Sequence, residues 1–244
     1  MTRVEVYSWL FVCKQWAEFA RAPSWDKGFE DSFRQYLYSK ISFDVLSDLG
    51  DTGFGLSYDT LSGVPHELDV ICRKDRHVFV FELKHYEISS LSKEIVFTFL
   101  GKVIDFYIRN PDSLSSYKIT MLLVTINKNV DDAIRALCLA YGIRLIEPSI
   151  MTLAGMDYFA RDLYEKLGET GGELKLEVAR FIENLAELRE HYNYSFSDLF
   201  RYRNGSIELG PVGLGISPSA AVGKIARHYR EFEKLWQRWK AKTN

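Results

Sequence analysis

The sequence predicts an α/β protein in which helices flank a mixed central β-sheet. Two changes in the spacing of the apolar residues lead to this prediction. Residues 3–40 repeat their apolar groups at helical spacing, and over residues 54–85 the repeat shortens to two, the period of a β-strand. After residue 85, helical segments alternate with short apolar runs. A series of strands followed by such an alternation is typical of a mixed sheet covered by helices.

The expected elements follow one another along the chain. Two helices come first, at residues 3–21 and 26–40, and Pro23 separates them. Three short strands are expected next, at residues 54–60, 66–73 and 77–84. A helix, a strand, a helix and a strand then complete a core, at residues 92–109, 119–126, 130–141 and 143–146. Beyond Pro148 the strand signal fades, and three further helices are expected at residues 150–168, 174–191 and 219–242, with a loop at 204–218.

These elements divide the chain into three parts. Residues 1–25 form an N-terminal helix, residues 26–148 a core and residues 149–244 a helical C-terminal extension. The apolar pattern of the extension is as typical of a separate helical subdomain as of helices wrapped around the core, so both interpretations stay open.

The composition is that of a soluble globular protein, with 47% hydrophobic and 26% charged residues. No apolar run approaches the roughly 18 residues that a membrane-spanning helix needs. The three cysteines are far apart and form no CxxC pair, which argues against a disulfide framework or a zinc cluster. We therefore expect a cytoplasmic protein that does not engage a membrane.

The formal net charge of −2 counts against a protein that coats nucleic acid non-specifically, because that affinity comes mainly from a basic footprint. An enzyme that engages nucleic acid through one local groove is compatible with this charge.

Three charged residues stand out because their strands are otherwise largely apolar. Alternation places Glu82 and Lys84 on one face of the strand 77–84, and a hairpin about residues 74–76 brings Asp69 close to Glu82. Burying such charges unpaired is costly, so a partner or a metal is expected. Two adjacent carboxylates repel unless a cation bridges them, and their hard oxygens favour Mg²⁺ or Mn²⁺. Lys84 would position or activate a water whose pKa the metal lowers, which suits phosphodiester hydrolysis.

The same residues resemble the signature of the PD-(D/E)XK nucleases, the restriction-endonuclease-like superfamily. Asp69 is followed, after a gap of twelve residues, by Glu82-Leu83-Lys84. The resemblance implies that Asp69 and Glu82 bind the metal, that the backbone carbonyl of Leu83 joins them, and that Lys84 assists the attacking water. It also implies a mixed central sheet of the restriction-endonuclease type.

A glutamate on an N-terminal helix often completes the site in this family. Glu30 is placed as that residue would be, and Asp31 is its nearby rival. Downstream, residues 99–106 are similar to the helix after the ExK strand in archaeal Holliday-junction-resolvase-like and Mrr-like members. The resemblance covers roughly residues 26–148, and Leu68 stands before Asp69 where the family name has proline.

The function expected from these residues is that of a divalent-metal-dependent endonuclease. DNA as the polymer, a structure-specific or restriction-like action and a homodimer rest on the resemblance alone, and the same site would also cut RNA. The rival interpretation is a catalytically inactive nucleic-acid-binding or assembly module on the same fold. The intact Asp69, Glu82 and Lys84 favour the enzyme, since a retired site would be free to lose them.

Further residues are candidates for nucleic-acid contacts. His66 and His85 flank the site, and Lys102 could reach a phosphate, although a lone lysine on a helix is usually solvated. The last helix, residues 219–242, has one apolar face and otherwise basic faces that include Arg227 and Arg230. It is interpreted either as a docked helix with a soluble exterior or as an arm that grips phosphates or forms a dimer.

Overall fold

The computed structural model describes residues 33, 56–58, 62–74, 76–84, 91–109, 114, 116–125, 130–147, 153–191, 196–203, 206–209 and 218–243. Apart from Phe33, the helices expected at residues 3–21 and 26–40 lie outside this part of the chain. The candidate residues Glu30, Asp31 and His85 lie outside it as well.

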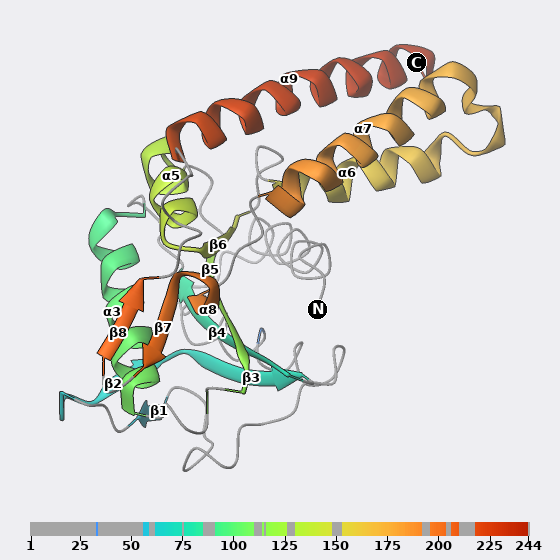
Figure 1. Ribbon diagram of the computed structural model, residues 1–244. Helices are drawn as coiled ribbons and strands as arrows, with labels where there is room; N and C mark the ends of the chain where they lie inside the picture. Colours follow the sequence, from blue (N-terminus) through green and yellow to red (C-terminus); the bar gives the residue numbers. More distant parts are fainter. Residues whose placement is uncertain are drawn as a thin grey trace, which may run out of the picture.

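A four-stranded mixed sheet, in the order β3-β4-β5-β6, forms the centre of the protein (Figure 1). Its strands are Val70–Lys74 (β3), His77–Lys84 (β4), Lys118–Thr125 (β5) and Ile143–Ile146 (β6). β3 pairs with β4 in antiparallel fashion, whereas β5 runs parallel to β4 and β6 parallel to β5. The prediction of an α/β protein with a mixed sheet flanked by helices is confirmed at this level.

The two central strands, β4 and β5, are buried along almost their whole length. Both are nearly continuous apolar runs, as expected of strands that are covered on two sides. One face of β4 packs through Val80 against Phe99 of α3 (Lys93–Arg109). On the other face, the ring of Phe81 meets that of Phe33 edge-on, with 5.2 Å between the ring centroids. The site lies at the end of one of these two buried strands.

The strand expected at residues 66–73 is broken at Asp69. The segment forms β2 (His66–Leu68) and β3, and β2 pairs with β1 (Leu56–Tyr58) in a separate two-stranded sheet. Leu68 joins the same apolar cluster as Ile71, whereas unbroken alternation would place the two on opposite faces. The prediction of one continuous strand is therefore wrong here, because the bend at Asp69 resets the alternation.

Three long helices of the C-terminal part pack around an apolar core of their own. They are α6 (Leu153–Lys166), α7 (Gly172–His191, after the 3-10 turn η2 at Glu169–Gly171) and α9 (Pro218–Thr243). Figure 1 shows them side by side as an arm at the β6 edge of the sheet. α9 also packs against α5 (Asp132–Ala140), which anchors the arm to the α/β core. No helix in the described ranges is both long and apolar enough to span a bilayer.

Between α7 and α9 the chain returns to the α/β core. α8 (Phe196–Leu199) leads into the hairpin of β7 (Phe200–Arg203) and β8 (Ser206–Leu209). The ring of Phe196 packs on that of Tyr107 of α3, with 5.2 Å between the ring centroids. Ser197 Oγ accepts a hydrogen bond from the backbone N–H of Ile119 at 2.8 Å. The expectation of helices and loop alone after Pro148 is wrong in this stretch. The sequence does carry the signal, because Asn-Gly at 204–205 between short alternating runs is typical of a two-residue hairpin.

Candidate functional site

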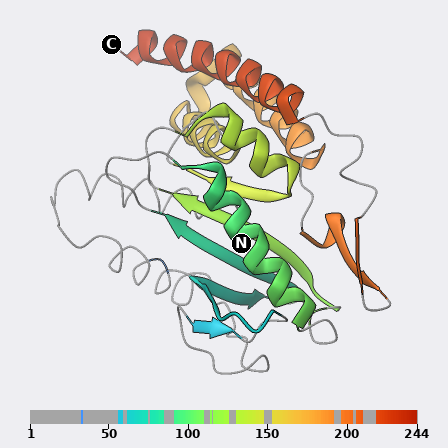
Figure 2. The ribbon, with the colours of Figure 1, turned by 90° about the vertical axis from the view of Figure 1, so that its left-hand side faces the viewer.

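The candidate site lies at the edge of the sheet where β4, β5 and β6 end together (Figure 2). The parallel register sets Lys84, the last residue of β4, beside Thr125, the last residue of β5. Ligands of open α/β sheets bind outside the carboxyl ends of the strands. The sheet therefore delivers the charged end of β4 to the edge at which ligand binding is common.

Asp69 reaches this edge from the bend between β2 and β3. If the β3–β4 register is continued by one residue beyond the Val70–Phe81 pair, Asp69 comes opposite Glu82. Its Oδ2 accepts a hydrogen bond from the backbone N–H of Leu83 at 2.6 Å and lies 3.6 Å from Nζ of Lys84. The carboxylate is buried, and this hydrogen bond and ion pair compensate part of its lost hydration.

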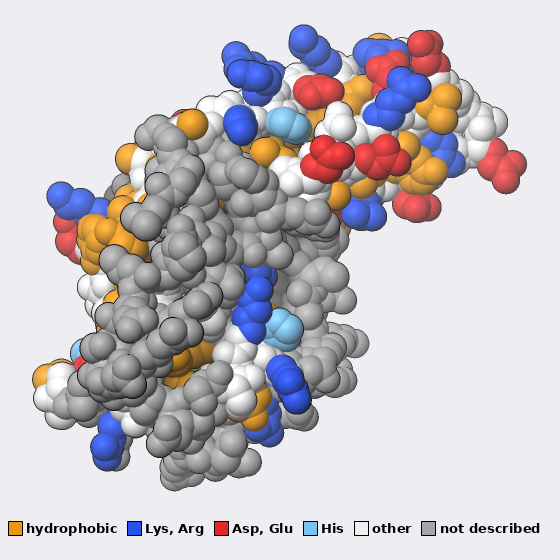
Figure 3. Space-filling view, in the orientation of Figure 1, with side chains coloured by type: hydrophobic (Ala, Val, Ile, Leu, Met, Phe, Trp, Pro, Cys, Tyr) orange, Lys and Arg blue, Asp and Glu red, His pale blue; other side chains and the backbone are white. Residues whose placement is uncertain are grey.

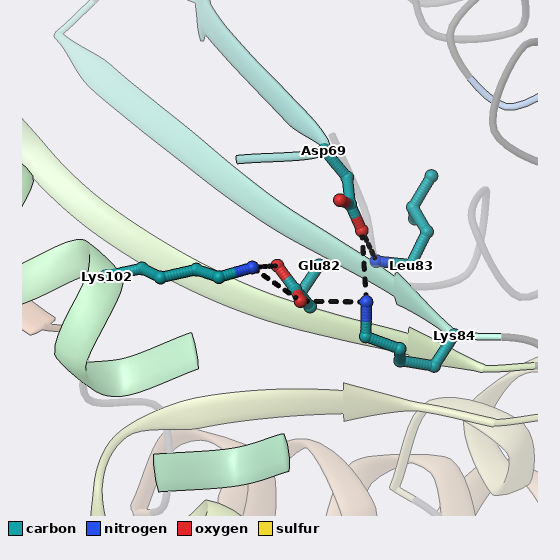
Figure 4. Close-up of polar contacts among 5 residues, drawn as sticks. All are labelled: Asp69, Glu82, Leu83, Lys84 and Lys102. Carbon is teal, nitrogen blue, oxygen red and sulfur yellow. Dashed lines mark hydrogen bonds and ion pairs between the residues drawn. The ribbon is translucent and has the colours of Figure 1, made fainter. Parts of the chain in front are cut away.

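Glu82 is the most deeply buried of the charged groups at this site, with 3% of its side chain exposed. Its Oε1 lies 2.8 Å from Nζ of Lys84 and 3.1 Å from Nζ of Lys102, and Lys102 also donates to Oε2 at 3.3 Å. Figure 4 shows the two ammonium groups reaching Glu82 from different elements, Lys84 from the same strand and Lys102 from α3. Glu82 thus ties the end of β4 to the helix that covers it.

Lys102 belongs to the site as a partner of Glu82. The sequence predicts a solvated lysine or a phosphate contact, yet only 18% of its side chain is exposed and it pairs with Glu82. A signal was present: Lys102 lies three residues after Phe99 and four before Phe106, so it stands on the buried stripe of α3. A lysine within an apolar helical stripe needs a carboxylate partner, and Glu82 is that partner.

The four side chains balance in charge, because two carboxylates face two ammonium groups. Such a buried network is stable only when each charge keeps a partner. Lys84 is central to it, since its Nζ contacts both Asp69 and Glu82. A single positive group at the position of Lys84 Nζ therefore contacts both carboxylates at once.

A divalent metal fits these donors. Mg²⁺ is usually held by one or two carboxylates, while waters and substrate phosphates complete its shell. Asp69 and Glu82 supply two carboxylates within reach of one cation, and the carbonyl of Leu83 lies between Glu82 and Lys84 in the chain. In the described part of the chain, no group of three or more His, Cys, Asp or Glu residues is placed to hold a metal. The described residues therefore offer a metal two carboxylates and leave its other coordination positions open.

A third buried carboxylate, that of Glu147, follows β6 at the same edge of the sheet. Arg135 of α5 donates to both of its oxygens, through Nε at 2.7 Å and a terminal nitrogen at 3.2 Å. Burial raises the pKa of Glu147, and the hydrogen bonds from Arg135 oppose that rise. Because both carboxylate oxygens accept from one guanidinium, we interpret the pair as a clamp that holds α5 on β6.

His66, expected to flank the site, is joined to α3 by Asp105. Its Nε2 lies 3.1 Å from Oδ2 of Asp105, and Ser62 bonds to the same carboxylate through its backbone N–H and its hydroxyl. Burial raises the pKa of Asp105, but the hydrogen bonds from Ser62 and His66 outweigh it and hold that pKa below its usual value. These contacts fasten the segment before β2 to α3.

The remaining candidates lie elsewhere. Arg227 and Arg230 are exposed on α9, and no contact joins either of them to the Asp69 cluster within the described ranges. Glu30 and His85 fall outside those ranges. Of the expected metal ligands and catalytic residues, the structure therefore brings together Asp69, Glu82, Leu83 and Lys84.

Comparison with known proteins assigns no family. No protein-family model matches the chain, and no curated protein matches it. Among solved structures, the crystal structure of AF1548, described as a protein of unknown function, aligns with a TM-score of 0.39 and 13% sequence identity. The alignment covers 84% of this chain and 98% of that one. At this TM-score the likeness assigns neither a fold family nor a function.

Proposed function

We propose that the protein is a divalent-metal-dependent endonuclease that hydrolyses phosphodiester bonds at Asp69, Glu82 and Lys84. The observation that carries the proposal is the contact of one nitrogen, Nζ of Lys84, with two buried carboxylates at the carboxyl end of β4. Buried carboxylates that converge on one cation, with a lysine at the same point, suit metal-assisted attack of water on a phosphodiester.

Each residue has a defined role in this proposal. Asp69 and Glu82 hold Mg²⁺ or Mn²⁺, together with the backbone carbonyl of Leu83. When bound, the metal lowers the pKa of a coordinated water and neutralises charge that develops on the phosphate. Lys84 gives up its contacts with the carboxylates and orients the attacking water through Nζ. The hydrogen bond from the N–H of Leu83 keeps the Asp69 carboxylate aimed at the site.

DNA is the proposed polymer, and a restriction-endonuclease-like core is the proposed fold family. Both rest on the resemblance of Asp69 and Glu82-Leu83-Lys84 to the PD-(D/E)XK signature. The antiparallel β3–β4 hairpin followed by parallel β5 and β6 is compatible with that fold. Glu30 as accessory ligand, a homodimer and a cytoplasmic location belong to the same proposal.

The second candidate function is a nucleic-acid-binding module without catalysis. The observation in its favour is the charge balance, since Lys84 and Lys102 neutralise Asp69 and Glu82 without a metal. A network that is satisfied in this way would serve as a structural brace between β4 and α3.

A cleavage assay separates the two functions. Wild type and Asp69→Asn are incubated with Mg²⁺, Mn²⁺ or EDTA and a panel of duplex, single-stranded and branched DNA and RNA. Asp131→Asn is the matched control, because Asp131 is exposed and its side chain makes no capping hydrogen bond to α5. We expect metal-dependent cutting by wild type and control, and a loss of about 10²-fold or more in Asp69→Asn.

Equal, trace-level cutting by all three proteins on every substrate would overturn the nuclease proposal. Binding of a panel member by all three without cutting would instead support the non-catalytic module.

A further inference from the structure

α9 concentrates positive charge in a chain that is slightly acidic as a whole. Its 26 residues contain seven lysines and arginines and two glutamates, a surplus of five positive charges. Because the formal net charge of the chain is −2, the remainder of the chain carries a net charge of −7. The chain thus separates its charges, with an excess of one sign on a single helix.

One face of α9 is occupied by the core of the arm. Phe232 and Leu235 are buried there, and Trp236 packs beside them. At 100° per residue, Arg227, Arg230 and Lys234 project from the opposite side, and all three are exposed. We call these three residues the basic stripe. Figure 3 shows lysine and arginine side chains along the outer edge of this helix.

The basic stripe has no counter-ion in the described part of the chain, where none of its three side chains forms an ion pair or a side-chain hydrogen bond. Glu231 and Glu233 lie on the same helix, yet no ion pair forms with them. Other basic residues of the arm are paired: Arg238 with Glu177, Arg161 with Asp157 and Lys166 with Asp162.

The three charges of the basic stripe repel one another, although Glu231 stands four residues after Arg227 and Glu233 three residues after Arg230. Arg227 and Arg230 are three residues apart and Arg230 and Lys234 four apart, so each pair places like charges on neighbouring positions of one face. Like charges at these spacings destabilise a helix. A polyanion along the face would remove this repulsion.

We propose that the basic stripe binds the phosphate backbone of a nucleic acid and so holds the substrate of the site at Asp69 and Glu82. The stripe covers about 10 Å of helix axis, a length over which one strand of a B-form duplex presents about three phosphates. Its side chains are hydrogen-bond donors only, which suits phosphate oxygens, and contacts to phosphates carry no direct readout of base sequence. This inference rests on the proposed nuclease function.

α9 leaves open space beside the basic stripe and is held on the α/β core. Gly223, one turn before Arg227, is exposed, and apart from its chain neighbours and the adjacent backbone of α9 no atom lies within 4 Å of the position that a Cβ would take. α9 packs on α5, the helix that follows β5 at the carboxyl edge of the sheet. The arm is therefore anchored to the core through the helix that connects β5 to β6.

The test measures binding without cleavage. Fluorescence anisotropy of a labelled duplex is recorded in EDTA at several salt concentrations, for wild type and for the triple variant Arg227→Ala, Arg230→Ala, Lys234→Ala. A charge-count control removes three positive charges from α6 and α7 by Lys166→Ala, Lys175→Ala and Arg180→Ala, and thermal melting checks its folding as well, because Lys166 pairs with Asp162 and Lys175 donates to the carbonyl of Gly168. Alanine is the best helix former, so the stripe variant is expected to fold, and thermal melting of the full chain checks this.

We expect the stripe variant to bind at least about tenfold more weakly at 0.1 M salt, and its slope of log Kd against log salt to fall by about 2 to 3. The control variant should bind within about twofold of wild type. Unchanged affinity and salt slope in the stripe variant would overturn the inference, and so would equal losses in both variants.

Two further outcomes separate this inference from the proposed function and from self-association. If wild type cuts nucleic acid while the stripe variant binds as wild type does, the inference fails and the nuclease proposal stands. If sedimentation shows that the stripe variant loses a dimer but keeps nucleic-acid affinity, the stripe is an interface between copies of this chain and the inference fails. Absence of any binding by wild type overturns it as well.

Discussion

Replacing Lys84 by methionine is expected to lower phosphodiester cleavage by about 10²–10⁴-fold. This is the usual contribution of a side chain that assists proton transfer in the transition state, here at the attacking water. Methionine keeps most of the apolar stem but removes Nζ, which lies 2.8 Å from Glu82 and 3.6 Å from Asp69. The two carboxylates stay in place and lose a competing cation. The rate of cleavage should therefore fall while the affinity for Mn²⁺ is kept or rises.

Two measurements on the same protein test this separation. Single-turnover cleavage at saturating Mn²⁺ gives the chemical rate, and titration of free Mn²⁺ by electron paramagnetic resonance gives the metal affinity without substrate. Lys166→Met serves as control, because Lys166 lies on the arm and is about half exposed. If cleavage and Mn²⁺ binding fall together in Lys84→Met, Lys84 supports the shape of the site and its assigned role at the water is wrong.

Glu82→Gln is expected to destabilise the metal-free protein by about 3 kcal/mol. Glutamine keeps the size of the side chain but removes the charge that faces both Lys84 and Lys102. Removing one member of a buried pair typically costs about 3–5 kcal/mol, and the lower end applies because the two lysines are 23% and 18% exposed. Most of this loss arises from the Lys102 ammonium group, which is left without Glu82 in a partly buried place, whereas Lys84 keeps its contact with Asp69.

Urea unfolding of a double-mutant cycle measures this effect. The variants are Glu82→Gln, Lys102→Met and the pair combined, with the exposed Glu183→Gln as control for loss of charge. The combined variant should lose at least about 1 kcal/mol less than the sum of the single variants, because each single change orphans a charge that the pair removes. Additive losses, or a cost for Glu82→Gln no larger than that of Glu183→Gln, would show that this ion pair contributes nothing to the fold.

The parts of the site that depend on local geometry were predictable from the sequence. Glu82 and Lys84 are two residues apart on one strand, so alternation alone puts them on one face. A short turn between β3 and β4 then brings Asp69 opposite Glu82. The hydrogen bond from Leu83 to Asp69 was not predictable, because it depends on the bend at Asp69, where β2 leaves the main sheet to pair with β1.

Other features were decided by packing between distant segments. The position of Lys102 beside Phe99 and Phe106 on α3 predicts a partner, but which carboxylate it meets depends on how α3 docks on β4, since Glu82 is twenty residues away. The C-terminal helices were expected from their spacing, but one apolar stripe suits a separate core as well as the surface of the sheet. The hairpin of β7 and β8 has only a local turn signal in the sequence, and the helical spacing of the apolar residues on both sides favours helix and loop instead.

Crystals soaked in Mn²⁺ test the central claim most directly, through the anomalous difference density at the carboxyl end of β4. We expect a peak in direct coordination with one oxygen of Asp69 and one of Glu82, accompanied by movement of the Lys84 ammonium away from both carboxylates. Saturating Mn²⁺ that produces no peak there, with Lys84 still in contact with Asp69 and Glu82, would contradict a metal site formed by these residues.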